Sequence, residues 1–221
     1  MLRRSQGHPG MSVRRAAVLI QQQRARKPLP SPVPIGDPWQ FWSAEILHQI
    51  LGSPIGNIRV QWPFVVSALT GLGIADRPVQ IAALATIGVE AGAFWPVREA
   101  YYLGEPEPAE TWRRNNLWYY PWFGRGLIQL THAGNYRTYG EMASALLGRP
   151  VDLIARPDDA LLTDVSAAVL ALYFMHHIYQ SGYGIPAAAR AGDWPTTRIL
   201  VNGGLTGYSD YISYVRQLEA A

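Results

Sequence analysis

One stretch between residues 79 and 90 constrains the fold of this chain more than any other part of the sequence. It reads Val-Gln-Ile-Ala-Ala-Leu-Ala-Thr-Ile-Gly-Val-Glu, and from Ile81 to Val89 only Thr86 is polar and no residue is charged. Pro78 suits the first turn of a helix. A helix that is apolar on every side is normally surrounded by other parts of the protein. We therefore expect this segment to form a buried helix.

Glu90 ends the apolar segment, at the helix end where the dipole disfavours an anion. Burial also disfavours the ionised form of a carboxyl group. A carboxylic acid that stays protonated near neutral pH can act as a general acid. Glu90 is therefore a candidate general acid. The alternative is that Glu90 marks the point at which the helix reaches solvent.

A second carboxylate, Glu99, follows nine residues later. Gly92 and Pro96 favour a turn between the two acids, so we expect them to face each other across a bend. Glycoside hydrolysis uses such a pair, with one carboxyl group protonated and the other ionised. Arg98 is expected to lie beside Glu99 and keep it ionised. The alternative for Arg98 is a surface ion pair that contributes little to stability.

The segment from Trp118 to His132 combines aromatic residues, glycines and polar residues. An aromatic run, Trp-Tyr-Tyr-Pro-Trp, precedes Phe-Gly-Arg-Gly-Leu-Ile-Gln-Leu-Thr-His. Glycine permits backbone angles and close approaches that other residues forbid, and apolar faces of sugar rings stack on aromatic rings. The pattern indicates a wall of a sugar-binding cleft; the alternative is a hairpin with a polar edge. Four aromatic residues could line either the cleft or the core: Tyr101, Tyr102, Trp118 and Tyr120.

In this order, these segments resemble glycoside hydrolase family 19, which includes chitinases and phage endolysins. The likeness is greatest to the glycosidase domain of mycobacteriophage-type lysins. The matching segments cover most of residues 60–215 and are residues 85–90, 96–100, 124–131, 135–136 and 201–204.

The resemblance implies an inverting hydrolase with a lysozyme-like, mainly α fold of the α+β type, in which two helical lobes and a small β-hairpin surround a cleft. It implies that Glu90 is the general acid, that Glu99 is the general base, and that Thr131 positions the water molecule. The two carboxyl groups of an inverting pair lie roughly 6.5–9.5 Å apart. The residues expected to bind substrate are Arg98, Tyr102, Tyr120, Arg125, Gln129, Asn135 and Asn202. No cofactor is implied.

The sequence departs from the family pattern at three places. Val89 precedes the acid where the family often has histidine. Residues 91–93 read Ala-Gly-Ala where a Ser/Thr-Gly-Gly segment is common, and Tyr211 occupies a position that is commonly arginine. These departures concern the substrate subsites, because Glu90 itself is retained.

Composition is consistent with one globular domain of 221 residues without cysteine, which excludes disulfides and thiolate zinc sites. We expect a basic tail at 1–27, a linker with five prolines at 28–38, and the hydrolase domain at 39–221. The basic excess suits an anionic cell wall; a nucleic-acid surface is less favoured, because the arginines lie in an end segment. His176 and His177 are adjacent on a predicted helix, so their side chains point about 100° apart and they are poor joint metal ligands.

The apolar run at 16–20 is shorter than the ~7–15 residues of a signal-peptide core. No stretch approaches the ~20 apolar residues of a membrane span. We therefore expect no membrane insertion and synthesis in the host cytoplasm; the resemblance implies that a monomer then reaches the cell wall through a hole made by another protein.

Hydrophobic periodicity predicts a mainly helical chain. The sequence predicts a hairpin at 117–131 and helices at 39–51, 62–72, 78–90, 109–116, 132–147, 158–179, 186–191, 194–201 and 208–219.

These observations together predict an enzyme that cleaves β-1,4 glycosidic bonds of bacterial peptidoglycan. Chitin is the alternative substrate, since both polymers contain β-1,4-linked N-acetylglucosamine. A lytic transglycosylase would need Glu90 without a water-activating base. A non-catalytic wall-binding module is the remaining alternative.

Overall fold

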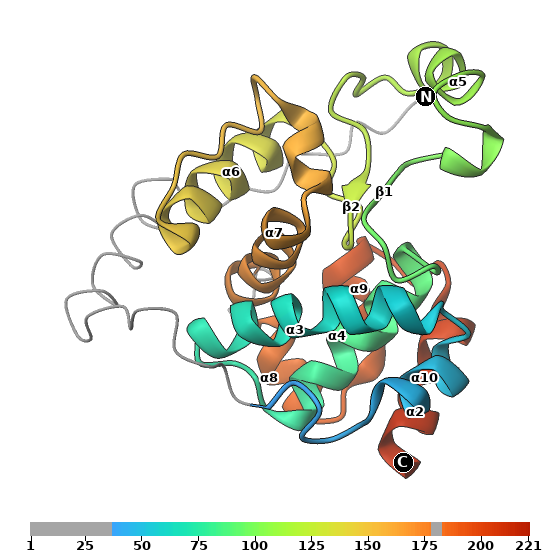
Figure 1. Ribbon diagram of the computed structural model, residues 1–221, viewed down its shortest axis with the longest axis vertical. Helices are drawn as coiled ribbons and strands as arrows, with labels where there is room; N and C mark the ends of the chain where they lie inside the picture. The colour runs from blue at the N-terminus through green and yellow to red at the C-terminus, as the bar shows by residue number, and fades with distance from the viewer. Residues whose placement is uncertain (1–36, 178–182) are drawn as a thin grey trace, which may run out of the picture. The chain divides into compact units, whose positions relative to one another are not determined.

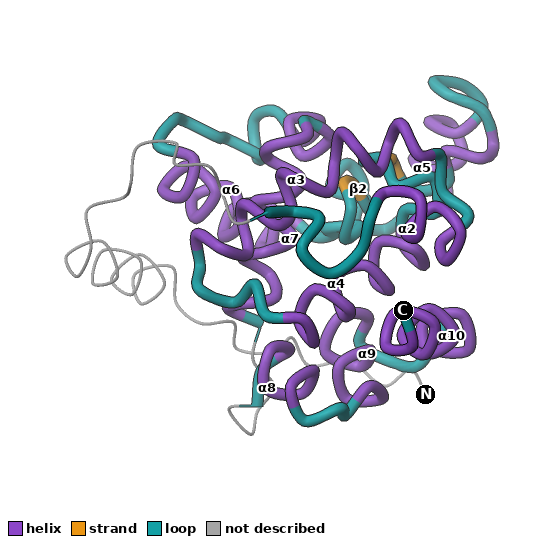
Figure 2. Tube along the Cα trace, turned by 60° about the horizontal axis from the view of Figure 1, so that its bottom comes forward, coloured by secondary structure: helices purple, strands orange, loops and turns teal. Residues whose placement is uncertain are grey.

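The computed structural model describes residues 37–177 and 183–221, which belong to one compact unit spanning Pro34–Ala221. This unit is mainly helical and carries a two-stranded antiparallel sheet (Figures 1 and 2), which confirms the predicted fold class. None of the helices in the described ranges has the length and apolar character needed to cross a membrane. The predicted basic tail and all but the end of the predicted linker lie outside the described residues.

The α-helices of the described residues are α2 (Ala44–Leu51), α3 (Ile55–Gly71), α4 (Arg77–Glu90), α5 (Ala109–Asn116), α6 (Ala133–Leu147), α7 (Thr163–His176), α8 (Ile185–Arg190), α9 (Trp194–Asn202) and α10 (Tyr208–Ala220). The strands are β1 (Val97–Arg98) and β2 (Arg125–Gly126), and the 3₁₀ helices are η1 (Tyr101–Leu103) and η2 (Pro157–Leu161).

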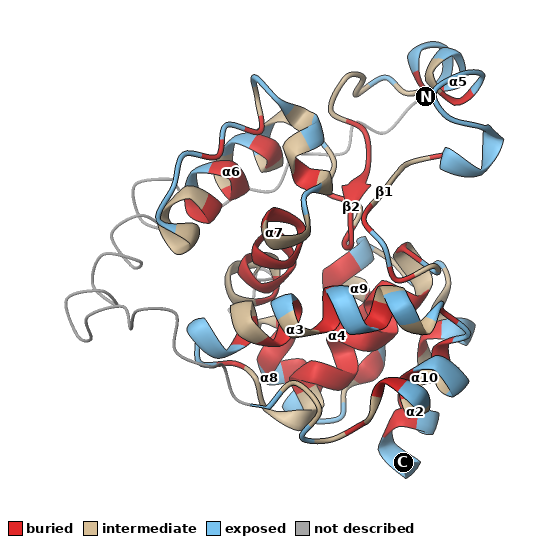
Figure 3. Ribbon diagram, in the orientation of Figure 1, coloured by how far each residue is buried: buried red, intermediate tan, exposed pale blue. Residues whose placement is uncertain are grey.

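The apolar segment forms the buried helix that its sequence predicts. Every residue of α4 from Val79 to Gly88 is buried, and α4 packs against α8, α9 and α10 (Figure 3). A Cβ atom at Gly88 would lie 2.8 Å from the ring of Tyr214 on α10, so a glycine is needed for this close helix contact. The packing carries the end of α4, with Glu90, to the edge of the helical core.

Helix α7 is the centre of a second group of helices, since it packs against both α3 and α6. The prediction of one helix from 158 to 179 was wrong at its start. Residues 157–161 form η2, Leu162 is extended, and α7 begins only at Thr163. Asp158 in η2 is held by two arginines from the sheet, a tertiary interaction that hydrophobic periodicity does not reveal. At the other end α7 stops at His176, and the predicted residues 178–179 lie outside the described ranges.

The two-stranded sheet joins segments that the sequence analysis treated separately. Strand β1 pairs with β2, with Val97 opposite Gly126 and Arg98 opposite Arg125. The predicted hairpin within 117–131 therefore had the wrong partner, because β2 forms the sheet with residues 97–98. Inside the predicted range, Arg125 and Leu130 exchange backbone hydrogen bonds of 3.2 and 2.9 Å, which close a tight loop.

Two helices near the start of the unit begin at different places from those predicted. Helix α2 begins at Ala44 because Ser43 caps it, accepting a 3.3 Å hydrogen bond from the N–H of Ile46. Helix α3 begins at Ile55, well before the predicted residue 62, and continues through Pro63. Tertiary packing of α3 against α7 and α2 accounts for a helix that contains an unfavourable proline.

Candidate active site

A cavity of about 310 Å³ lies where both groups of helices meet the sheet. Its walls come from the end of α4, the residue after β1, the segments on both sides of β2, the first turn of α6, the last turn of α7 and the end of α9. The lining residues are Glu90, Glu99, Gly124, Ile128, Gln129, Leu130, Thr131, Asn135, Tyr173, Val201 and Asn202. Both predicted catalytic carboxylates and Thr131 therefore line one cavity.

Glu90 contacts a buried cation that the sequence analysis did not identify. Oε1 of Glu90 accepts a 2.6 Å hydrogen bond from Nη1 of Arg198, whose side chain is 2% exposed. The same guanidinium donates to the carbonyl of Thr206 from Nε at 2.9 Å and from Nη2 at 2.6 Å. Glu90 thus ends the apolar helix beside a buried charge that the burial argument did not include, and the guanidinium fixes the orientation of its carboxyl group.

Tyr211, one of the three departures noted in the sequence, lies inside the core. Tyr211 of α10 is fully buried. Burial raises the pKa of the Tyr211 hydroxyl, and the neighbouring charge of Arg198 opposes that rise. Residue 211 carries no cation, and the guanidinium that contacts Glu90 comes from α9.

Tyr173 is a further lining residue that the sequence analysis placed only in a helix. Its hydroxyl lies 3.4 Å from the carbonyl of Val201, at the wall formed by α9. Burial raises the pKa of the Tyr173 hydroxyl, and the charge of Glu90 raises it further. Tyr173 therefore lies within the electrostatic reach of Glu90, in the last turn of α7.

Glu99 is held by neutral donors on both of its carboxylate oxygens. Oε1 accepts a 2.9 Å hydrogen bond from the hydroxyl of Tyr119, and Oε2 accepts a 2.8 Å hydrogen bond from the backbone N–H of Gly124. The backbone N–H of Glu99 donates to the carbonyl of Gly124 at 2.7 Å, which continues the pairing of β1 with β2. Glu99 is thus positioned by the sheet and by one tyrosine.

Arg98 was expected to be the partner of Glu99, and this expectation was wrong. Arg98 forms ion pairs with Asp158 at 2.8 Å and with Glu105 at 3.6 Å. Successive side chains of an extended chain point to opposite sides, so Arg98 and Glu99 leave the strand in different directions. Arg98 is also absent from the residues that line the cavity, although it was predicted to bind substrate.

The Gly-Arg-Gly motif at 124–126 is explained by close packing. A Cβ atom at Gly124 would lie 2.7 Å from Oε1 of Gln129 and 3.3 Å from Glu99, and a Cβ at Gly126 would lie 2.8 Å from the hydroxyl of Ser166. The φ angle of Gly126 is 83°, which also favours glycine. The two glycines allow the loop to approach Glu99 on one side and α7 on the other.

Arg125 of the same motif is buried and points away from the cavity lining. It forms a 2.7 Å ion pair with Asp158 and donates to the carbonyls of Pro121 and Phe123 at 3.0 and 3.2 Å. Its predicted substrate contact is not seen in the lining of the cavity. The guanidinium holds the loop and η2 together.

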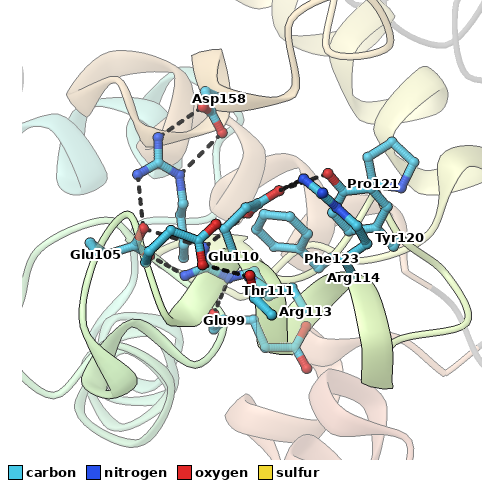
Figure 4. A network of polar contacts seen from close by, with 12 residues as sticks. Glu99, Glu105, Glu110, Thr111, Arg113, Arg114, Tyr120, Pro121, Phe123 and Asp158 are labelled. Carbon is cyan, nitrogen blue, oxygen red and sulfur yellow. Dashed lines mark hydrogen bonds and ion pairs between the residues drawn. The ribbon is translucent and has the colours of Figure 1, made fainter.

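Tyr120 belongs to a network of charged side chains that contacts the backbone of Glu99 (Figure 4). Arg113 of α5 is fully buried, pairs with Glu105 and Glu110, and donates to the backbone carbonyl of Glu99 at 2.6 Å. The hydroxyl of Tyr120 donates to Glu110 at 2.7 Å. Tyr120 therefore belongs to this network, outside the cavity lining.

Tyr102 lies apart from the cavity lining as well. It is 75% exposed on η1, where it contacts the ring of Tyr101. The predicted sugar contacts of Tyr102 and Tyr120 thus have no counterpart in the walls of the cavity.

The remaining predicted substrate residues do line the cavity, and their roles stay predictions. Nε2 of Gln129 donates to the carbonyls of Val97 at 3.0 Å and Gly126 at 3.1 Å, which fixes the orientation of its amide. Asn135 lies in the first turn of α6, and Asn202 is the last residue of α9. The cavity thus combines two carboxylates with hydroxyl and amide groups, a set that suits a polyhydroxylated substrate.

An aromatic cluster contacts Glu99 from outside the cavity lining. The ring of Tyr119 lies 5.4 Å from that of Trp118 and 4.9 Å from that of His132, measured between centroids. Trp118 also contacts His132 at 5.2 Å, and its side chain is 85% exposed. The cluster joins an exposed aromatic surface to a residue that touches Glu99.

No metal centre is evident in the described ranges, 37–177 and 183–221. None of the groups of His, Asp and Glu side chains there brings three possible ligands together.

No family model matches the chain, and no curated protein matches it. Among solved structures it is similar to a bacterial family 19 chitinase, whose enzymatic properties are described as differing from those of plant enzymes. The TM-score is 0.48 and the identity 18%, over 80% of this chain and 94% of that one. This likeness is too distant to assign a family or an activity to the chain.

Proposed function

We propose that this protein is an inverting glycoside hydrolase that cleaves the β-1,4 bonds of bacterial peptidoglycan. The observation that supports the proposal is that Glu90 and Glu99, from separate elements, line one cavity together with Thr131 and the three polar residues Gln129, Asn135 and Asn202. Paired carboxylates around a substrate site are the requirement of glycoside hydrolysis.

Glu90 acts as the general acid in this mechanism. Its Oε1 is occupied by Arg198, whereas Oε2 accepts no hydrogen bond from the described residues. A proton on Oε2 is transferred to the glycosidic oxygen as the bond from that oxygen to the anomeric carbon breaks, so that the leaving sugar departs as a neutral alcohol.

Glu99 acts as the general base. A water molecule held by Thr131 gives a proton to the Glu99 carboxylate while its oxygen attacks the anomeric carbon from the face opposite the leaving group. The hydroxyl of Tyr119 and the N–H of Gly124 are uncharged donors, and they hold the carboxylate in place during this step. The product carries the α configuration at the new reducing end, since the β bond is displaced with inversion.

Peptidoglycan is proposed as the substrate because of the lysin-like motifs in a chain without cysteine. Chitin shares the β-1,4 N-acetylglucosamine unit and is the second candidate. The cavity residues are compatible with either polymer, because amide and hydroxyl groups bind the N-acetyl and hydroxyl groups common to both.

The test is digestion of purified peptidoglycan and of chitin oligomers by the wild-type protein and by Glu90→Gln. Mass spectrometry identifies the sugar at each new end, and proton NMR of the first products gives their anomeric configuration. We expect α-anomeric reducing ends from the wild type only, with peptidoglycan cleaved in preference to chitin.

Other outcomes separate the alternatives. Anhydro-sugar ends would indicate a lytic transglycosylase, and cleavage of chitin alone would make chitin the substrate. Lysis by Glu90→Gln at the wild-type rate would contradict the catalytic assignment. Binding of both polymers without any product would favour a wall-binding module.

A further inference from the structure

Tyr119 makes the side-chain hydrogen bond to the candidate base, a contact that the motifs in the sequence do not indicate. It lies in the loop between α5 and β2, and its hydroxyl donates to Oε1 of Glu99 at 2.9 Å. The N–H of Gly124 occupies the other carboxylate oxygen at 2.8 Å. These two hydrogen bonds fix the plane of the carboxylate. A side-chain substitution can remove the donor of Tyr119 but not the backbone N–H of Gly124.

The hydroxyl of Tyr119 remains a donor over the working pH range of ordinary enzymes. Burial raises its pKa to about 12, and the hydrogen bond to Glu99 contributes to the rise. Because a neutral phenol donates and cannot accept the proton from an attacking water, Tyr119 itself is not a base.

The ring of Tyr119 is held by two neighbours. Trp118 and His132 both contact it nearly edge to face, with interplanar angles of 85° and 71°. His132 directly follows Thr131, and its N–H donates to the carbonyl of Trp122 at 2.8 Å. The same short loop therefore places the hydroxyl of Thr131 and the ring that orients Glu99.

We propose that Tyr119 is a positioning residue that aligns the Glu99 carboxylate with the water molecule held by Thr131. This inference rests on the proposed function of Glu99 as the base. Without the hydroxyl, the carboxylate keeps only the contact to Gly124 and rotates about its terminal bond. Proton abstraction is then slower, whereas substrate binding is unchanged, because Tyr119 is not among the residues that line the cavity.

The experiment compares Tyr119→Phe with Tyr101→Phe. Tyr101→Phe is the control, since it removes the same hydroxyl group from a 41% exposed ring outside the cavity lining. On a soluble peptidoglycan fragment that the wild type cleaves, we expect Tyr119→Phe to lower kcat about tenfold and to leave KM within about twofold, as for an interaction made in the transition state. We expect Tyr101→Phe to keep wild-type kcat and KM.

A double variant separates positioning from a general structural role. Glu99→Gln with Tyr119→Phe should turn over no more slowly than Glu99→Gln alone, because Tyr119 acts through Glu99. Thermal unfolding of every variant shows whether the fold is retained. A tenfold loss that persists in the Glu99→Gln background would overturn the inference, as would a change in KM without a change in kcat.

The failure of this inference is distinguishable from failure of the proposed function. Wild-type turnover by Tyr119→Phe beside an inactive Glu99→Gln overturns the positioning role alone. Wild-type turnover by Glu99→Gln itself overturns both the base assignment and the role of Tyr119.

Discussion

Glu90 and Glu99 reach the same cavity but are held in different ways. Glu90 is paired with the buried charge of Arg198, which lies 108 residues away in the sequence. Glu99 has neutral donors, Tyr119 and Gly124, which are 20 and 25 residues away. The comparison teaches that similar side chains in one cavity acquire different surroundings from the elements that carry them: a helix end packed against another helix, and a strand end within a loop.

The strongest test of this difference is rescue by a small nucleophile. Glu90→Ala and Glu99→Ala should each lower kcat by about 10²–10⁴-fold, the usual contribution of general acid–base catalysis. Added azide should restore turnover to Glu99→Ala, because an anion that needs no deprotonation replaces water, and an α-glycosyl azide should form. Rescue of Glu90→Ala with no rescue of Glu99→Ala would reverse the two roles.

The charged partner of Glu90 should matter for stability. Arg198→Met removes the buried guanidinium that donates to Glu90 and to the carbonyl of Thr206, and leaving these acceptors unpaired costs about 1–3 kcal/mol. The matched control is Arg59→Met: Arg59 pairs with Glu45 at the same distance, 2.6 Å, with side chains 59% and 56% exposed. Its expected cost is less than about 1 kcal/mol. Urea unfolding measures both, and equal losses would show that burial does not distinguish the pairs.

The neutral surroundings of Glu99 can be disturbed through the backbone. A Cβ in Gly124→Ala would approach Oε1 of Gln129 to 2.7 Å and Glu99 to 3.3 Å. Displacement of the base should lower kcat about 10- to 100-fold, since small misplacements of catalytic groups have effects of this size. Gly56→Ala is the control, because no atom lies within 4 Å of its new Cβ. Equal activity of the two variants would argue against tight packing at Gly124.

A smaller effect is expected at the exposed edge of the Glu99 side. Trp118→Ala removes an 85% exposed ring next to Tyr119, and we expect KM to rise about three- to tenfold, equivalent to about 0.7–1.4 kcal/mol. We expect kcat to fall by less than about threefold, because His132 still contacts the ring of Tyr119. Phe64→Ala on α3, which removes a 44% exposed ring, should leave KM unchanged. Kinetics on a glycan strand and on a shorter fragment would show whether the Trp118 contact lies beyond the cleaved bond. Unchanged KM for both variants and both substrates would remove Trp118 from the binding surface.

The smallest effect concerns pH and the loop that carries Gly124. Burial raises the pKa of Asp158, but hydrogen bonds and charges of Arg98 and Arg125 outweigh it and hold that pKa below its usual value. A depressed carboxyl pKa stabilises the fold above the unfolded value of about 3.9, and the stabilisation is lost as the pH falls through the lower folded value.

Asp158→Asn should therefore be less stable than the wild type at pH 7, by less than about 1 kcal/mol because the side chain is 55% exposed. The difference should shrink as the pH falls below about 4. Thermal unfolding of both proteins at pH 7 and pH 3 measures it, and a difference that grows in acid would contradict the sign.

The sequence pattern predicted the helices whose formation depends mainly on their own residues. The buried helix α4 follows from its almost entirely apolar residues. The partner of β2 did not follow, because a strand of two residues carries too little pattern to select residues 97–98 over a hairpin. The break before α7 was missed for a related reason: Asp158 is held by arginines distant in sequence.

The candidate site likewise contains residues that the sequence predicted and residues that it did not. Glu90, Glu99 and Thr131 were identified from motifs, and the structure brings them to one cavity. Arg198 and Tyr119 could not be assigned, because an arginine in a short helix and a tyrosine in an aromatic run carry no local sign of the carboxylate that each contacts. Arg98 was assigned to the wrong carboxylate because the side chains of two successive residues in an extended chain point to opposite sides.

The main-chain contact from Gly124 to Glu99 has a consequence for how such a protein can diverge. An N–H group belongs to every residue except proline, so no exchange among ordinary side chains erases the donor, although bulk at this position would disturb it. The ring of Tyr102, by contrast, is 75% exposed on η1, so this position is freer to vary. Under the proposed function, descendants of this chain could therefore change their polysaccharide preference through exposed side chains and keep the geometry around Glu99.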